Sequence, residues 1–68
     1  MKKYDARLEQ WTTIGKCLWG TVYEDSKGRF ADGTEVQTSK VISHSINDVE
    51  EGIVIDTLHT SYLLGKRI

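Results

Sequence analysis

The Asp32-Gly33 pair is the strongest local constraint on how this chain folds. Asp-Gly readily adopts the positive φ values that tight hairpin turns require. The residues after it, from Thr34 to about Ser43, alternate with the two-residue period of a strand. We therefore expect a tight turn here, with strands before and after it and with Gly33 at positive φ.

Three further segments have strand character. Residues 12–24 are β-branched and aromatic, and Gly15 and Gly20 within them indicate a bend or a bulge. Residues 53–55 form the most apolar short run, as in a central strand, and residues 61–65 close the pattern. Turns are expected at residues 25–28 and 58–60. This spacing predicts an all-β domain, either a small SH3-like barrel or a bent four- to five-stranded antiparallel sheet.

The first residues allow two interpretations. Tyr4, Leu8 and Trp11 have the i, i+4, i+7 spacing of a helix, and Asp5 is a suitable N-cap. As a strand, the same segment has no cleanly apolar face. We expect a short N-terminal helix or turn to about Gln10, followed by a strand.

Residues 45–52 interrupt the β pattern. Asn47 is a suitable cap for a single helical turn, Glu50 lies three residues on as its capping partner, and Gly52 is a natural stop. One helical turn is therefore predicted between the two halves of the sheet.

The predicted core follows from the strand pattern. Between residues 17 and 23, alternation places Leu18, Gly20 and Val22 on one face. The opposite face receives Cys17, Trp19, Thr21 and Tyr23. Six aliphatic residues are expected to be buried, with either Trp11 or Trp19 packed against them: Val22, Val36, Ile42, Ile53, Ile55 and Leu64.

The size of the chain limits its stability. Its 68 residues form one domain, and a domain of this size buries only about 60% of the surface that its unfolded chain exposes. Self-association, for instance as a homodimer, is one way to complete so small a core. The single cysteine, Cys17, excludes an internal disulfide, and two histidines with one cysteine do not make a zinc set. We expect no metal and no cofactor.

Charge and hydropathy narrow the expected partners. The formal net charge of −1 argues against a dedicated nucleic-acid binder, which normally carries a basic excess. No segment approaches the ~20 apolar residues of a membrane span, and the first residues lack the apolar core of a signal peptide. The expected location is the cytoplasm, without membrane contact.

One sequence pattern resembles that of a known group of proteins. It begins with the strand Gly20-Thr21-Val22-Tyr23 and continues through Arg29-Phe30, Asp32-Gly33-Thr34, Val36, Thr38-Ser39, Thr57, Ser61-Tyr62 and Leu64-Gly65. Over residues 20–65 this is similar to very short proteins encoded by phages and prophages. The resemblance implies an origin in a mobile element and no particular reaction.

The chain has few candidates for catalysis. Cys17 with His44 or His59 is a conceivable thiol–imidazole pair, but no spacing aligns these residues with one another or with a serine hydroxyl. A small β domain also has little room for a cleft that excludes water and shifts pKa values. We interpret Cys17 as a small apolar strand residue and expect the protein not to be an enzyme.

Protein binding is the first functional hypothesis. The resemblance to phage proteins implies a host protein as partner, such as a defence or regulatory factor that the chain inhibits. Acidic residues can mimic phosphate charge against a basic groove, and exposed aromatic residues are frequent hot spots. The candidate partner-binding residues are Asp48, Glu50, Glu51, Asp56, Trp19 and Tyr23.

Two alternatives remain open. In the first, Trp19, Tyr23 and Phe30 form a stacking platform for nucleic acid beside a basic stripe, although these rings are also suited to filling the core. The candidate nucleic-acid contacts are Lys16, Lys27, Arg29 and Lys40. In the second, a homo-oligomer encloses a nucleotide signal between its subunits and so acts as a sponge for it.

Overall fold

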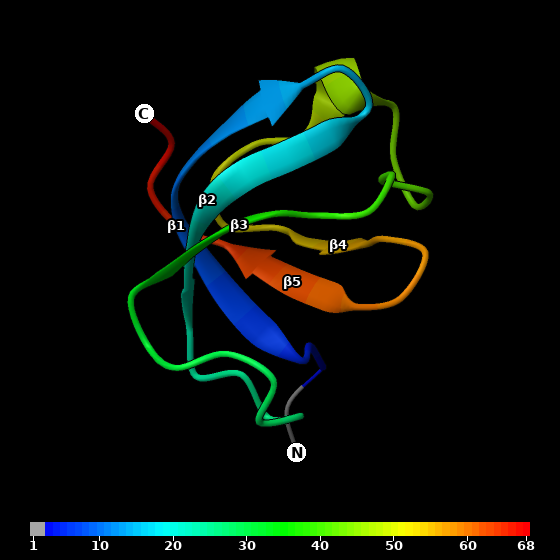
Figure 1. The fold of residues 1–68 in the computed structure, drawn as a ribbon. Helices are drawn as coiled ribbons and strands as arrows, with labels where there is room; N and C mark the ends of the chain where they lie inside the picture. Colours follow the sequence, from blue (N-terminus) through cyan, green and yellow to red (C-terminus); the bar gives the residue numbers. More distant parts are fainter. Residues whose placement is uncertain (1–2) are drawn as a thin grey trace.

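The computed structural model describes residues 3–68, and its regular secondary structure consists of strands and one short 3₁₀ turn. The elements are β1 (Ala6–Ile14), β2 (Cys17–Tyr23), β3 (Thr34–Gln37), the 3₁₀ turn η1 (Ile46–Asp48), β4 (Val54–Asp56) and β5 (Ser61–Leu64). The strands form one five-stranded sheet in the order β3-β2-β1-β5-β4 (Figure 1). The all-β prediction is confirmed in its bent-sheet form.

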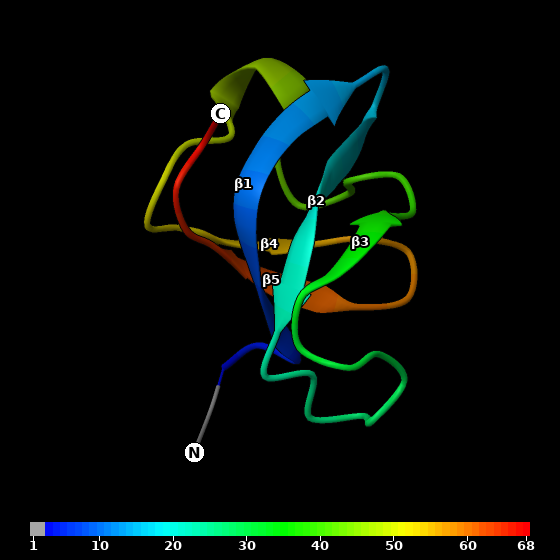
Figure 2. The ribbon, with the colours of Figure 1, turned by 60° about the vertical axis from the view of Figure 1, so that its left-hand side comes forward.

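The sheet is mixed and open, which corrects the antiparallel and barrel alternatives. β1 pairs antiparallel with β2 but parallel with β5, where Ala6 lies opposite Tyr62 and Leu8 opposite Leu64. The sheet curves strongly (Figure 2). After β3 the chain returns to the end of β4, where Val41 and Thr57 form an isolated bridge. The two edges thus meet at one point without a continuous ladder between them.

A β-bulge bends β1 at its middle. Gln10 and Trp11 together stand opposite Gly20 of β2, because the register of the two strands shifts there. Gln10 has a φ of 49°, the left-handed conformation usual for the first residue of a G1 bulge. A Cβ atom on Gly20 would lie 2.8 Å from Cγ of Leu8 and 3.0 Å from Cβ of Trp11. Gly20 is therefore the residue that lets the bent strand approach β2.

The bulge explains why the predicted N-terminal helix is wrong. Ala6 and Leu8 point into the core before the bulge, and Trp11 points into it afterwards. Because of the extra residue at Gln10, the inward-facing residues Leu8 and Trp11 are three positions apart and not two. A separation of three is also typical of one face of a helix. A second correction follows, because Gly15 lies in the turn between β1 and β2 and not inside a continuous strand.

The turn at Gly33 is confirmed, but it does not join two strands directly. Gly33 has a φ of 88°, and the N–H of Thr34 donates to the carbonyl of Ala31 (3.2 Å). A loop of residues 24–33 separates β2 from β3. The expected turn between β4 and β5 is also present, since the N–H of Thr57 donates to the carbonyl of Thr60 (2.8 Å).

The predicted helical turn exists with different limits. It is the 3₁₀ turn η1, with Ser45 at its N-cap position and Val49 at its C-cap position. Asn47 lies inside the turn and does not cap it, and Gly52 (φ 88°) belongs to a separate turn before β4.

The C-terminal residues continue the parallel pairing beyond β5. The N–H of Trp11 donates to the carbonyl of Lys66 (3.2 Å), and the N–H of Ile68 donates to the carbonyl of Trp11 (2.9 Å). The indole Nε1–H of Trp11 donates to the carbonyl of Gly65 (2.9 Å), and the Arg67 guanidinium lies over the indole ring, 4.9 Å from its centre. Trp11 is therefore held by the tail on its backbone, its edge and its face.

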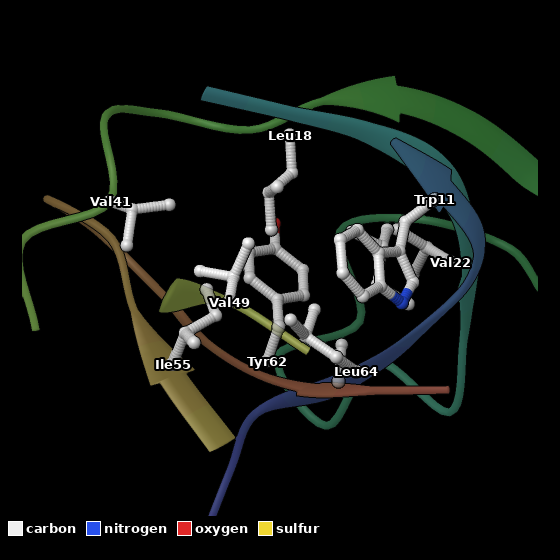
Figure 3. Packing of buried hydrophobic residues seen from close by; sticks show 10 residues of the cluster. Trp11, Leu18, Val22, Val41, Val49, Ile55, Tyr62 and Leu64 are labelled. Carbon is white, nitrogen blue, oxygen red and sulfur yellow. The ribbon is translucent and has the colours of Figure 1, made fainter. Parts of the chain in front are cut away.

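The core lies between the two halves of the curved sheet (Figure 3). Val22, Ile55 and Leu64 are buried as predicted, and Val36 and Ile53 are partly buried against them. The buried hydrophobic residues are Ala6, Leu8, Trp11, Leu18, Val22, Val41, Val49, Ile55, Tyr62 and Leu64.

Ile42 was predicted to be buried and is not. Its exposed fraction is 56%, whereas its neighbour Val41 is buried. The strand alternation ends at Gln37, and the hydroxyl of buried Thr38 accepts a hydrogen bond from the N–H of Leu18 (3.0 Å). Because regular strand pairing ends here, the two-residue alternation of β3 does not predict on which face Ile42 lies.

Two isoleucines provide a matched test of the core. Replacing fully buried Ile55 by alanine should lower the free energy of unfolding by about 2–5 kcal/mol, because the cavity adds to the lost transfer energy. The same change at Ile42 should cost less than about 0.5 kcal/mol. Urea unfolding followed by tryptophan fluorescence measures both, and equal losses would contradict the assigned core.

The bulge is tested by glycine substitution. Gln10→Gly should raise the free energy of unfolding by about 0.5–1 kcal/mol. A residue with a Cβ atom costs about 1–2 kcal/mol in the left-handed conformation, and glycine avoids this cost. The greater conformational entropy of glycine in the unfolded chain cancels only part of the gain. Thr12→Gly, in the regular part of β1, should lower stability instead. If Gln10→Gly were as destabilising as Thr12→Gly in chemical denaturation, the bulge would not be at Gln10.

Candidate binding surfaces

Trp19 lies exposed on the outer face of β2. Its exposed fraction is 40%, whereas that of Trp11 is 0%, so the structure settles which tryptophan belongs to the core. Trp19 stands between Thr12 of β1 and Gln37 of β3. Tyr23 is on the same face of β2 but is half-buried, and the Arg7 guanidinium lies 5.2 Å from its ring centre. Trp19 is therefore the more available of the two predicted aromatic contacts.

Two further residues extend this surface. Ile14 is 47% exposed and pairs across the hairpin with Cys17, a half-buried free thiol. Cross-strand partners share a face, so both belong to the face that carries Trp19. We call Ile14, Cys17 and Trp19 the hairpin face. Sequence reasoning missed Ile14, because the bulge at Gln10 determines which residues of β1 point outward.

The four predicted acidic residues are exposed but do not form one patch. Asp48, Glu50 and Glu51 follow one another in η1 and the turn after it. Asp56 is at the far end of β4, and a strand rises about 3.3 Å per residue. Glu51 accepts a hydrogen bond from the N–H of Arg67 (2.9 Å), and Asp56 accepts one from the Ser61 hydroxyl. Asp48, Glu50 and Glu51 thus remain candidates for contact with the same partner, and Asp56 does not.

The predicted basic stripe is divided as well, because Lys27 and Arg29 belong to an internally bonded loop. The carboxylate of Asp25, which has no exposed surface, organises residues 24–33. It accepts hydrogen bonds from the backbone N–H groups of Lys27 (3.1 Å), Arg29 (2.9 Å) and Phe30 (3.1 Å). These bonds determine where the two basic side chains leave the loop.

Both of these cations contact their own chain. Arg29 Nη1 donates to the Thr60 hydroxyl (2.7 Å), and Arg29 Nε lies 3.5 Å from Oδ2 of Asp25. Lys27 Nζ donates to the carbonyl of His59 (3.0 Å) and lies 3.4 Å from Oδ2 of Asp5. The loop is thereby tied to the start of β1 and to the turn between β4 and β5.

Lys16 lies at the opposite end of the sheet from this loop, whereas the carbonyl of Lys40 accepts a hydrogen bond from the N–H of Leu58 (3.2 Å), in the turn between β4 and β5. Lys16 is in the turn between β1 and β2, next to η1, whereas the loop of residues 24–33 is at the other end (Figure 1). Lys16 and Lys40 line a cavity of about 410 Å³. Of the four predicted nucleic-acid contacts, two therefore line this cavity and two are bound within the chain.

Within residues 3–68, the pKa values of Asp5, Asp25 and Tyr62 are shifted. Burial tends to raise the pKa of Asp25, but its three backbone N–H bonds and the Arg29 guanidinium lower it overall. The N–H of Ser61, which donates to Asp5 (3.0 Å), lowers the pKa of that carboxyl, helped by Lys27. Burial raises the pKa of the Tyr62 phenol.

Across residues 3–68 no helix is long and apolar enough to cross a membrane. Within the same residues, no group of three or more histidine, cysteine or acidic side chains is placed to hold a metal ion. We compared the chain with protein-family models, with curated proteins and with solved structures, and none of the three comparisons gives a match.

The shifted pKa of Asp25 predicts how stability depends on pH. A carboxyl whose pKa is lower in the folded than in the unfolded chain stabilises the fold above its unfolded pKa, here about 3.8, and this stabilisation is lost as the pH falls through the folded pKa. Asp25→Asn should lower the free energy of unfolding by about 2 kcal/mol at pH 7. The difference from the parent should shrink as the pH falls below about 4.

The matched control for this change is Asp48→Asn, which removes an equal charge from an exposed residue. Its unfolding free energy should follow that of the parent at every pH. Urea unfolding between pH 7 and pH 2 measures all three proteins. A loss in Asp25→Asn that does not depend on pH would show that the carboxylate charge does not hold the loop.

Proposed function

We propose that this chain is a non-enzymatic protein of phage or prophage origin that binds a host protein through its hairpin face. The observation that carries the proposal is the exposure of Trp19 on the outer face of β2. Tryptophan is the residue most enriched at interface hot spots. The host cytoplasm is the proposed place of action, and inhibition of the bound protein is the proposed effect.

The free edge of β3 supports a particular way of binding. β3 is the end strand of the sheet order and pairs only with β2, where Gln37 lies opposite Trp19. An edge strand presents unpaired backbone groups to which an extended segment can add. A partner segment along β3 would place its side chains beside Trp19. Asp48, Glu50 and Glu51 would add attraction toward a basic partner.

Nucleic acid is the less favoured partner. Binding of a nucleic-acid backbone, with its many phosphates, needs several free cations on one surface. Lys27 and Arg29 instead contact Asp5 and Asp25 within the chain, which leaves only Lys16 and Lys40 of the four predicted contacts available. A second copy of the chain, paired edge to edge through β3, is the other competing occupant of the same surface.

Capture from host lysate tests the proposal. The tagged parent should retain a host protein after nuclease treatment, and Trp19→Ala should weaken that binding at least about 30-fold, as expected for a hot-spot residue. Leu58→Ala, which truncates another exposed apolar residue (58% exposed) in the turn between β4 and β5, should bind like the parent. Both variants should keep the parent's melting temperature within a few degrees.

Three results would overturn the proposal. The first is capture that nuclease abolishes and that Lys16→Glu with Lys40→Glu removes, which would identify nucleic acid as the partner. The second is a concentration-dependent dimer of the purified parent, seen by sedimentation, that Trp19→Ala dissociates. The third is equal binding by Trp19→Ala and Leu58→Ala.

A further inference from the structure

A cavity opens at the end of the sheet where β1 turns into β2. Its volume of about 410 Å³ lies within the range of small-molecule sites, about 300–1,000 Å³. It has two cationic residues and no acidic residue in its lining, although the whole chain carries a net charge of −1. The lining residues are Lys16, Lys40, Val41, His44, Ser45, Ile46 and Asn47.

Backbone hydrogen bonds fix the positions of the two lysines. The carbonyl of Lys16 accepts from the N–H of Val41 (3.0 Å), and the carbonyl of Lys40 accepts from the N–H of Leu58 (3.2 Å). Both lysines are exposed, and neither ammonium group has an ion-pair partner within residues 3–68. Their state differs from that of Lys27, whose ammonium is bound by Asp5. The two charges at the cavity are therefore available to a ligand.

His44 is held at the cavity by its neighbour. The hydroxyl of Ser43 accepts a hydrogen bond from the N–H of Asp56 (2.8 Å) and lies 2.7 Å from Nδ1 of His44. When the hydroxyl donates its proton to Nδ1, the neutral ring carries its own proton on Nε2. In that tautomer His44 has a ring N–H for a ligand.

The remaining lining residues supply neutral donors and an apolar wall. The hydroxyl of Ser45 and the side-chain amide of Asn47 are both donors of hydrogen bonds. Val41 is buried and Ile46 is half-buried against the core, so both present fixed apolar surface. The cavity thus combines cations and neutral donors with a hydrophobic wall, as a site for an anion with an organic part requires.

We propose that this cavity binds a small molecule that carries a phosphate group. A phosphate monoester has a charge of about −1.5 to −2 at pH 7 and three acceptor oxygens, which matches two ammonium groups and the neighbouring donors. Lysine is a common phosphate ligand because it acts as a point charge. Val41 and Ile46 contact the organic part. The proposal does not depend on the hairpin face, since none of Ile14, Cys17 and Trp19 lines the cavity.

Amide chemical shifts of the ¹⁵N-labelled full chain test this proposal. The probes are inorganic phosphate, adenosine monophosphate and adenosine, added at low ionic strength because salt screens exposed charges. Both phosphates should shift the amide signals of residue 16 and residues 40–47. Adenosine monophosphate should bind more tightly than inorganic phosphate, and adenosine alone should leave these signals unchanged.

Charge-matched variants show whether the lysines are responsible. Lys16→Gln and Lys40→Gln should each weaken binding of adenosine monophosphate about tenfold, the usual effect of one charge-assisted hydrogen bond. Lys66→Gln removes the same charge outside the cavity and should leave the affinity unchanged. Each change keeps the backbone carbonyl that bonds to Val41 or Leu58, so the fold should persist, and Lys40→Arg, which keeps the charge, should retain binding.

The proposal is overturned if neither inorganic phosphate nor adenosine monophosphate shifts the amide signals of residues 40–47 at concentrations up to about 10 mM. A dissociation constant above about 10 mM corresponds to a binding free energy weaker than about 3 kcal/mol. It is also overturned if Lys66→Gln weakens binding as much as Lys16→Gln, since the attraction would then be general. Equal shifts with adenosine and adenosine monophosphate would show an apolar site without a phosphate contact.

Discussion

Trp11 is the residue on which the arrangement of the whole sheet depends. The bulge before it turns its side chain into the core, and the C-terminal tail then binds it through two backbone hydrogen bonds, the indole N–H and the Arg67 guanidinium. Burial of a tryptophan removes a large apolar area from water, which matters in a domain with so small a core. One residue thereby ties the first strand to the tail that follows the last strand.

The parts of the fold that follow local rules were predictable. Alternation in β2 puts Leu18 and Val22 on one face and Trp19 on the other, although it left open whether Trp11 or Trp19 packs in the core. The Asp32-Gly33 pair gives a turn with positive φ. Two elements were not predictable for identifiable reasons. The bulge residue is Gln10, which carries no sequence signal for a left-handed conformation. Buried Thr38 ends β3 through a bond to β2, and this long-range contact decides that Ile42 is exposed.

The candidate surfaces depend on contacts that are distant in sequence. The side chain of Lys27 is bound by Asp5, and that of Arg29 by Asp25 and Thr60. A count of basic residues therefore overestimates the positive charge available to a ligand. A hydrogen bond from the N–H of Val41 to the carbonyl of Lys16 holds residues 40–47 beside the turn at Lys16, and both segments line the cavity. Composition alone cannot distinguish a lysine bound within the chain from one that is free.

The position of β1 has a consequence for how the chain is made. β1 is synthesised first but lies in the middle of the sheet, between β2 and a parallel partner, β5, that is synthesised last. Until residues 61–68 leave the ribosome, one edge of β1 stays unpaired and Leu8 and Trp11 lack the neighbours that cover them. Contacts between distant parts of a chain also slow folding. The nascent chain therefore exposes an unpaired strand edge until β5 has been made and has paired with β1.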